Sequence, residues 1–533
     1  MTAPATPFSP GTPGTFTPGP GGAAGAPDPK RTVARSYDGQ YHGTAEFRGG
    51  NCPQSTYYER GRFGRIFAGL PRYAPDPVQL MRLGAVGGPM DAADVAPPAT
   101  SPTNPDHPGG LEAGYTFLGQ FVDHDITFDP TSSLERQVDP EAVANFRTPN
   151  LELDNVYGSG PGASPHLYQR ADRDRLLVGE DLAGGRTDLP RNPEGTALLG
   201  DPRNDENLIV AQLHVAFLRF HNAVVDYVGT AVPAGRSRFE EAQRLVRWHY
   251  QHLVVHEFLP RVCGEDVVRD VLEHGRVLYR WRNEPYIPVE FAVAAYRFGH
   301  SQVRPGYAIS GTFARALFPV PPAPGAPPPP AGPPDPRPDL PPLPTSLTGG
   351  RRIRPEQVIE WRRFFDVGPA DPAAPVQTSK RFDPRLSTPL LHLPFARGTP
   401  DDPASLAQRN LMRGLTFGLP SGQAVARAMS AQLGRRRARR IEVLSRDELA
   451  ELRPFGLDEA TPLWYYVLRE ADLREDGRTL GNVGARIVAE VLIGLLEGDP
   501  LSYLSADRDW RPVLGTDPGV FKVSDLLRVA GVA

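Results

Sequence analysis

Cysteine is almost absent from this chain of 533 residues, and its two cysteines, Cys52 and Cys263, lie far apart. Two cysteines cannot form a disulfide framework, so the protein suits a reducing compartment or carries one disulfide at most. Long apolar runs are also missing, and no stretch approaches the length needed to span a bilayer. The N-terminal segment has neither a charged start nor an apolar run of the kind found in signal peptides. We therefore expect a cytoplasmic protein, with export by a non-classical route as the alternative.

An excess of either charge is missing as well. The formal net charge is −4, from 58 Lys and Arg residues against 62 Asp and Glu residues. No overall basic field attracts nucleic acid or an anionic membrane. The arginine run Arg435–Arg440 contains no aromatic residue, so a solvated helix face is a better interpretation than a nucleic-acid site. We expect no nucleic-acid partner and no transmembrane segment, and the oligomeric state stays open.

Proline and glycine, by contrast, are abundant, with 61 and 54 residues. Residues 1–33 are rich in both and predict a flexible tail. A second segment, Phe318–Pro344, cannot be a helix or a central strand, because proline lacks the amide donor and fixes φ. It is either a linker between two domains or a loop inserted into one domain. Because long loops cost little entropy, we favour an insertion over residues 318–349 within a single domain of residues 34–533.

Apolar periodicity in the rest of the chain predicts helices. Residues Asp205–Val228 and Phe239–Val262 place apolar side chains at helical spacing, and Gly481–Gly498 is apolar enough for a central helix. Strand-like alternation is scarce and no internal repeat is visible. With 40% hydrophobic residues the chain can build a large core. The predicted class is mainly α, with long loops.

Three histidines of the second predicted helix, His249, His252 and His256, recur at helical spacing. Three imidazoles on one face are able to bind zinc. Nothing in the surrounding sequence supplies the supporting residues of a zinc site, so structural histidines are the better interpretation.

Four segments place polar residues among apolar ones. They are "GQFVDHDITFDP" (119–130), "GDPRNDEN" (200–207), "AYRFGHSQVRPGY" (295–307) and "LAQRNLMRGLTFGLP" (406–420). Buried ionisable groups are costly unless each has a partner. In the second segment Asp201 or Asn204 is a candidate helix cap. Taken singly, each motif is explained by a satisfied core residue or a helix ion pair.

Together and in this order, the four segments resemble the animal haem peroxidase family of the peroxidase–cyclooxygenase superfamily. That family has a glutamine and a histidine flanked by aspartates, then Arg-x-x-Glu, then "RFGH", then Asn-x-x-Arg with "GLP" close behind. Intervening stretches such as "RTPNLELDNVYG" and "TPLWYYVLREA" look like its bacterial branch. The likeness runs from about Ala34 to the end of the chain. It implies a single large helical haem-peroxidase domain, with central helices around haem b.

On one side of the haem, the resemblance implies that His300 is the proximal iron ligand. Asn410 would accept from or orient the other ring nitrogen of His300, which sets ligand basicity. Arg297 and Arg413 resemble the arginines that hold haem propionates, a task suited to planar forked donors.

On the opposite side, the resemblance makes His124 the general base that takes a proton from hydrogen peroxide and returns it to the departing oxygen. Arg203 would stabilise the negative charge that develops as the O–O bond breaks. Gln120 would line the distal pocket and hold water or a small anion. The implied activity is reduction of hydrogen peroxide with oxidation of small organic donors or halides.

The two aspartates that flank His124 face elsewhere in this reading. Asp125 resembles a calcium ligand, and oxygen-only ligands suit that cation. Side chains of a later loop, and one carbonyl, would complete the site: Thr148, Asn150 (carbonyl), Glu152 and Asp154. Glu152 stands where the common mammalian pattern has an aspartate, so its longer arm alters the geometry.

Asp123 and Glu206 match carboxylates that form esters with haem methyl groups in some relatives. Ester bonds and simple hydrogen bonds within the pocket remain equal alternatives here. Because Asn207 and not methionine follows Glu206, the sulfonium link of one mammalian relative should be absent.

Two other functions compete with peroxidase activity on the same scaffold. Fatty-acid dioxygenases need a tyrosine near the proximal histidine, three residues before it in cyclooxygenases, where this chain has Arg297 and Tyr296 is one residue further back. A non-catalytic haem-binding relative is the second alternative, and the intact His124, Arg203 and His300 argue against it.

Overall fold

The structure is a computed structural model that describes most of the chain beyond residue 62. The described ranges are 63–94, 110–127, 148–182, 187–233, 235–281, 284–319, 343–369, 371–400, 402–434 and 440–533. The predicted tail, Cys52, the start of the domain near Ala34, most of the proline-rich segment and Arg435–Arg439 therefore lie outside the described residues.

Helices dominate the described part, and the predicted mainly α class is confirmed. The principal α-helices are α2 (Pro77–Leu83), α3 (Gly114–Ile126), α6 (Leu208–Val228), α7 (Arg238–Leu253), α8 (Leu259–Cys263), α9 (Glu265–His274), α12 (Leu406–Thr416), α13 (Gly422–Leu433), α14 (Leu463–Glu475), α15 (Asn482–Gly498) and α17 (Val523–Val529). Short helices include α4 (Asp154–Tyr157), α5 (Gly160–Ala163), α10 (Val289–Ala292), α11 (Gly299–Gln302) and α16 (Tyr503–Ala506). One-turn 3₁₀ helices, among them η4 (Pro202–Asp205) and η6 (Ala295–Phe298), precede α6 and α11.

The three helices expected from periodicity are all present. α15 agrees with its prediction within one residue, and its middle residues, Val488 to Ile493, are fully buried. The second helix is interrupted by a π-helical turn, η5 (Val254–Phe258), between α7 and α8. The cap of α6 is Asn207, whose Oδ1 accepts from the amides of Ile209 and Val210, and not Asp201 or Asn204. Those two earlier residues belong to η4 instead, where Asp201 is the cap.

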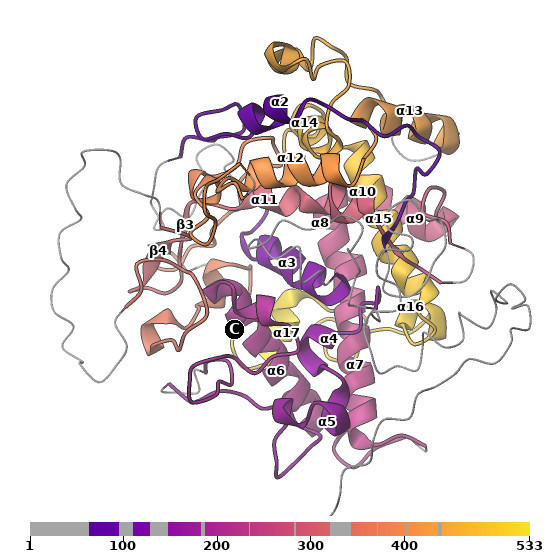
Figure 1. Ribbon diagram of the computed structural model, residues 1–533. Helices are drawn as coiled ribbons and strands as arrows, with labels where there is room; N and C mark the ends of the chain where they lie inside the picture. Colours follow the sequence, from indigo (N-terminus) through magenta and orange to yellow (C-terminus); the bar gives the residue numbers. More distant parts are fainter. Residues whose placement is uncertain are drawn as a thin grey trace, which may run out of the picture.

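Helix α3 lies at the centre of the molecule, with α11 and α12 on one side and α6 and α7 on the other (Figure 1). Its Phe121 ring stacks on Phe217 of α6, with 4.4 Å between ring centroids. Its first residue is glycine for a steric reason, because a Cβ at Gly114 would lie 2.3 Å from the Phe365 ring. Packing on two sides therefore fixes the helix that carries Gln120, Asp123, His124 and Asp125.

Strands are few among the described residues. β1 (Phe63–Gly64) pairs in parallel with β2 (Ile287–Pro288), and β3 (Gly306–Ala308) pairs antiparallel with β4 (Ala314–Ala316). Ala316, the last residue of β4, also forms a bridge with Ser346, and its carbonyl accepts a 2.9 Å hydrogen bond from the Leu347 amide. The two ends of the proline-rich segment thus lie side by side, as an inserted loop requires, although the division into tail, domain and loop stays a prediction.

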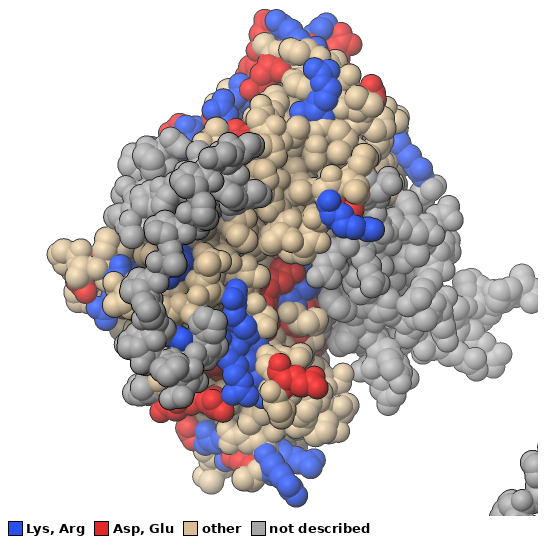
Figure 2. Space-filling view, turned by 60° about the vertical axis from the view of Figure 1, so that its left-hand side comes forward, with Lys and Arg blue, Asp and Glu red and all other residues tan. Residues whose placement is uncertain are grey.

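Helix α6 is long and apolar enough to span a bilayer by length and composition, which the sequence analysis did not expect. Within its most apolar window, 83% of the residues are buried inside the protein. This is the behaviour of a core helix, so the feature is weak evidence for a membrane span. On the face shown in Figure 2, Lys and Arg side chains (blue) and Asp and Glu side chains (red) are interspersed.

Candidate functional site

One cavity brings together most of the residues that the resemblance assigned to haem binding and catalysis. It encloses about 1260 Å³, including space open to solvent. Gln120, Asp123, His124, Arg203 and Glu206 line it on the side of α3 and η4, and Arg297 and His300 line it from η6 and α11. The apolar part of the lining includes Phe117, Phe298, Val303, Leu317, Phe318, Leu390, Leu393 and Leu406.

The spacing of α3 explains which of its polar residues reach the cavity. Gln120 and His124 are four residues apart and share one helix face. Asp123 also reaches the cavity, whereas Asp125 is fully buried and accepts a 3.0 Å hydrogen bond from the Asp154 amide. Of the two carboxylates that flank His124, Asp123 therefore lines the cavity and Asp125 is buried against residue Asp154.

Arg203 lines the cavity, but its guanidinium is held from behind. Nε and Nη2 donate to the two carboxylate oxygens of Asp201, at 3.1 and 2.8 Å. Nη2 also donates to the carbonyls of His124 and Thr127, which end α3. Burial opposes the charge of Arg203, but Asp201 outweighs it and raises the pKa of Arg203 above its usual value. The arginine is thus a fixed cation that also anchors α3.

Gln120 is held by two polar neighbours. Its Oε1 accepts from Asn207 Nδ2 at 3.2 Å, and its Nε2 donates to Glu206 Oε2 at 3.4 Å. Asn207 therefore has two tasks, because its own Oδ1 caps α6. The amide nitrogen of Gln120 is therefore directed at the Glu206 carboxylate.

Asp123 receives a 3.0 Å hydrogen bond from Thr127 Oγ1, and its carboxylate lies 4.0 Å from Arg203 Nη1. Burial raises the pKa of Asp123, while Arg203 and Arg297 pull the pKa in the opposite direction. The Asp123 carboxylate is therefore held by the hydrogen bond from Thr127 and attracted by Arg203 and Arg297. It lines the same cavity as Glu206.

His300 on the other wall is backed by α12. Its Nδ1 lies 2.7 Å from Asn410 Nδ2, and Asn410 Oδ1 accepts from Arg297 Nη1 at 2.5 Å. Burial, with a smaller effect from Arg297, lowers the pKa of His300 to about 3. A neutral imidazole is the form that ligates a metal. An amide nitrogen only donates, so this arrangement makes Nδ1 the acceptor and leaves the ring proton on Nε2.

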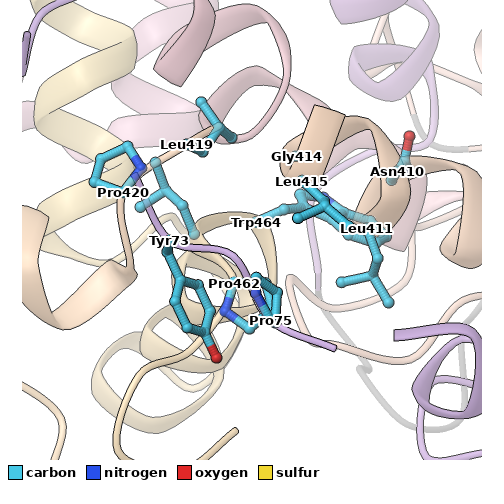
Figure 3. A pocket seen from close by; sticks show the side chains of 11 residues that line it. Tyr73, Pro75, Asn410, Leu411, Gly414, Leu415, Leu419, Pro420, Pro462 and Trp464 are labelled. Atoms are coloured by element: carbon cyan, nitrogen blue, oxygen red, sulfur yellow. The ribbon is translucent and has the colours of Figure 1, made fainter. Parts of the chain in front are cut away.

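Asn410 separates His300 from a second, much smaller pocket, shown in Figure 3. Tyr73, Leu411, Leu419 and Trp464 are among its mostly apolar walls. Trp464 also donates from Nε1 to the Arg297 carbonyl at 3.2 Å. Apolar side chains therefore surround Asn410 on this side, and its contact with His300 is partly buried.

Arg413, the second arginine assigned to a propionate, is not among the residues that line the large cavity. It is one turn beyond Asn410 on α12, and its guanidinium lies 5.5 Å from the centre of the Phe417 ring.

The loop assigned to calcium does meet α3. The Thr148 hydroxyl bonds to Glu152 and lies 3.4 Å from Asp154 Oδ2, and the Asn150 amide donates to the Thr148 carbonyl. Leu153 adopts a left-handed conformation at φ 60°, which costs energy in a residue with a Cβ and turns Asp154 towards Asp125. Burial and the neighbouring charge of Asp154 raise the pKa of Glu152 to about 7. Even so, no three His, Cys, Asp or Glu side chains in the described ranges are close enough together to hold a metal ion.

The three histidines of α7 and η5 do not gather around a common point. His249 donates from Nδ1 to the Leu245 carbonyl at 2.7 Å, and its Nε2 accepts from the amides of Val513 and Leu514. Both of its nitrogens are used by the backbone, as expected for a structural histidine.

Two residues behind His124 were not identified from the sequence as part of the site. Asn204 Oδ1 lies 2.7 Å from His124 Nδ1, and Asn204 Nδ2 lies 2.9 Å from His214 Nδ1. The sequence offered only a weak signal, because Asn204 fits equally well as a helix cap and His214 as a core histidine.

Comparison with known proteins shows which family part of the chain resembles. Residues 135–316 match the family described as animal haem peroxidase. This match covers about a third of the chain, and that part is similar to animal haem peroxidases. Haem is the cofactor that the name of the family implies.

Relatives within the animal haem peroxidases share short stretches of sequence. The human protein named probable oxidoreductase PXDNL is 26% identical over 237 residues, which are 41% of this chain and 16% of that protein. Rat thyroid peroxidase is 28% identical over 188 residues, which are 31% of this chain and 20% of that protein. The peroxidase-like protein of Margaritifera margaritifera is 36% identical over 111 residues, 20% of this chain and 14% of that protein. The chain thus spans only a small fraction of the length of these relatives.

Solved structures resemble the whole fold more completely. Peroxidase A from Dictyostelium discoideum has a TM-score of 0.56 at 15% identity, covering 91% of this chain and 97% of that one. The fatty acid alpha-dioxygenase of Arabidopsis thaliana has a TM-score of 0.51 at 12% identity, covering 94% and 83%. At these identities the likeness shows only that this chain shares its helical fold with both enzymes.

Proposed function

We propose that this chain is a haem-dependent peroxidase, which reduces hydrogen peroxide and oxidises small donor molecules. One observation carries the proposal: His124 and Arg203 line the same cavity as His300, on a different wall. A base and a fixed cation suit the cleavage of a peroxide, and a neutral imidazole across the cavity suits iron ligation.

The residues present fit a haem group. The cavity is open to solvent, and leucine and phenylalanine side chains form much of its lining, as a flat apolar group requires. His300 would hold the iron and Asn410 would support His300 from behind, with Arg297 as the candidate propionate partner. Bound haem would supply the iron at which peroxide is reduced and through which electrons leave the donor.

The chain's own residues supply the proton transfers. His124 would take a proton from the inner oxygen of hydrogen peroxide and return it to the outer oxygen, which leaves as water. Arg203 would stabilise the negative charge on that departing oxygen without moving, because Asp201 and the end of α3 already hold it. Asp201 therefore acts by positioning Arg203.

The charge balance around Gln120 favours organic donors over halides. Asp123, Asp201 and Glu206 all act on Arg203, the Gln120 amide nitrogen donates to Glu206, and the second arginine, Arg297, comes from the wall that carries His300. A halide anion entering this region would meet carboxylates, whereas a phenol or an aromatic amine can donate to them. Ester bonds from Asp123 or Glu206 to haem would remove that charge, and the mass of the extracted haem tells the two cases apart.

We also propose that calcium binds between α3 and residues 148–154. The support is a set of oxygen donors with crowded carboxylates, in which Glu152 resists ionisation beside Asp154. A divalent cation would neutralise these charges and hold the end of α3 that carries His124.

The test is reconstitution of the protein with haem, followed by stopped-flow addition of peroxide. The wild type should show a Soret band that changes when peroxide is added. Its turnover with a phenol as donor should exceed its turnover with bromide. His300→Ala should abolish the Soret band of bound haem. His124→Ala should retain the band but slow the peroxide reaction by about 10²- to 10⁴-fold, the usual contribution of a general base. Normal haem binding by His300→Ala would refute the axial assignment.

A fatty-acid dioxygenase is the second candidate function, because structures of that class share the fold. Tyr296 does line the cavity, but its hydroxyl donates to the Gly119 carbonyl at 3.2 Å, and Arg297 occupies the position three residues before His300. Oxygen uptake with linoleate and without peroxide would support this function over the peroxidase.

A further inference from the structure

His124 is connected to a second buried histidine through a single amide. Its Nδ1 lies 2.7 Å from Asn204 Oδ1, and Asn204 Nδ2 lies 2.9 Å from His214 Nδ1. The three side chains come from α3, η4 and α6, and their exposed fractions are 4%, 0% and 1%. The Phe121 ring meets His214 edge-on, 6.2 Å between centroids, so the second histidine is itself held by packing.

The amide group of Asn204 determines which atom is the hydrogen-bond donor and which is the acceptor in each of the two contacts. Asn204 has one acceptor group and one donor group, and the donor is directed at His214. Burial lowers the pKa of His214 to about 3, so His214 is neutral and its Nδ1 is able to accept. The acceptor of Asn204 then faces His124, whose Nδ1 must carry the proton that forms the 2.7 Å contact. In the neutral ring of His124, the remaining nitrogen, Nε2, is then the one without a proton.

We propose that Asn204 and His214 form a positioning pair that keeps His124 in the Nδ1–H tautomer, in which Nε2 is the nitrogen that can accept a proton from peroxide. Asn204 touches neither substrate nor haem in this proposal and acts only through His124. The inference rests on the proposed function for what His124 does, but the tautomer itself is a property of the protein without haem.

A purely structural role for Asn204 does not fix the direction of its amide. A buried amide that merely satisfies its neighbours would be as well satisfied with the amide turned round, Nδ2 towards His124 and Oδ1 towards His214. That arrangement protonates His124 on Nε2 and removes its ability to act as a base. The two cases differ in one measurable property, the nitrogen that carries the proton.

The first experiment measures that property directly in the protein without haem. Protein labelled with ¹⁵N-histidine is examined by long-range proton–nitrogen correlation, and the His124 signals are identified by their loss in His124→Ala. We expect a protonated Nδ1 and an unprotonated Nε2 for His124 at neutral pH. A protonated Nε2 would overturn the proposal, and this measurement needs no variant of Asn204 to fold.

The second experiment measures the rate constant for the reaction of hydrogen peroxide with the haem-loaded protein. Asn204→Leu should slow it by about 10²-fold, the lower end of the contribution of a general base. Asn204→Asp retains an acceptor for His124 and should recover most of the rate. Asn155→Leu is the matched control, because Asn155 is equally buried and also bonds to α3, through the Phe121 carbonyl at 3.3 Å, but does not touch His124.

A double variant tests whether Asn204 acts through His124. If Asn204 acts through His124, Asn204→Leu combined with His124→Ala should be no slower than His124→Ala alone. Additive losses would overturn the positioning role. If His124→Ala itself reacts at the wild-type rate, the proposed function fails instead, whatever the tautomer of His124 proves to be.

Discussion

Single side chains decide the chemistry on both walls of the cavity, and each acts through an amide behind it. His124 has Asn204 at 2.7 Å and His300 has Asn410 at 2.7 Å, and both amides are fully buried. The supporting partner of a metal ligand commonly changes metal affinity or activity by about 10- to 100-fold. The two histidines therefore depend on residues that no cofactor or substrate touches.

At the residue scale, we predict that Asn410→Leu weakens haem binding by about 10- to 100-fold, because His300 loses the partner that orients its ring. The measurement is a titration of the protein with haem, followed by Soret absorbance. Asn155→Leu, a buried amide outside the cavity, is the control and should bind haem as the wild type does. Equal affinity in all three proteins would show that Asn410 has no part in holding His300.

The residues also show where sequence analysis succeeds and where it stops. Gln120, His124, Arg203 and His300 could be identified because the family resemblance names them, and they line one cavity. Asn204 could not, because its contact with His124 spans 80 positions and depends on how η4 packs against α3. The cap of α6 was misassigned for a local reason, since Asp201, Asn204 and Asn207 are all good capping residues within one short segment.

At the scale of elements, the fold was easier to predict than its details. Apolar periodicity located α6 and α15 to within a few residues, because both are buried on several faces. The π-helical turn η5 was not foreseen, since the sequence pattern of a π-turn differs little from that of an α-helix.

The junction of α14 and α15 predicts a pH dependence. The Glu470 carboxyl accepts from the Val483 amide at the start of α15, and burial raises the pKa of Glu470 to about 8. A raised carboxyl pKa stabilises the fold below the unfolded value, about 4.5, and this contribution is lost as pH rises towards 8. Glu470→Gln should therefore be more stable than the wild type at pH 9, by on the order of 4 kcal/mol, and similar to it at pH 4.

Urea unfolding at several pH values measures this difference. Glu448→Gln is the control with the opposite sign, because a hydrogen bond from Arg474 lowers the pKa of Glu448 to about 2. That variant should lose its stabilising ion pair at neutral pH and match the wild type only in strong acid. A stability difference for Glu470→Gln that does not change with pH would contradict the burial argument.

The contact between α3 and residues 148–154 predicts a calcium dependence. Calcium at about 100 times its dissociation constant should raise the free energy of unfolding by about 2.7 kcal/mol. Asp154→Asn should abolish this response, whereas Glu180→Gln, at an exposed site outside the loop, should keep it. Thermal unfolding with calcium, magnesium or a chelator measures the effect, and an identical midpoint in all three conditions would exclude the site.

At the scale of the whole molecule, a single large cluster of buried apolar side chains runs from Phe63 to Ala530. Residues on both sides of the proline-rich segment belong to it, including Leu317 and Leu347. This continuity explains why an insertion fits the data better than a linker between independent domains, which would separate two cores.

We accordingly predict that replacing residues 321–341 by a short Gly-Ser linker leaves the fold and haem binding intact. Shortening a loop changes its closure entropy by only about 1 kcal/mol, and Ala316 and Ser346 already form a bridge. Circular dichroism, a single unfolding transition and the Soret band of reconstituted protein are the measurements. Loss of cooperative unfolding would show that the segment contributes to the core.

The bond from Arg297 to the Asn410 oxygen has a consequence for how the protein acquires its cofactor. In its present orientation the Asn410 amide leaves the His300 proton on the nitrogen that iron would need. A porphyrin whose acidic side chains draw the Arg297 guanidinium away would allow the amide to rotate and the proton to change place. We expect porphyrins with two free carboxylates to bind readily and the corresponding diesters to bind poorly. The same contact with Arg297 would then select the cofactor and set the protonation of the His300 ring.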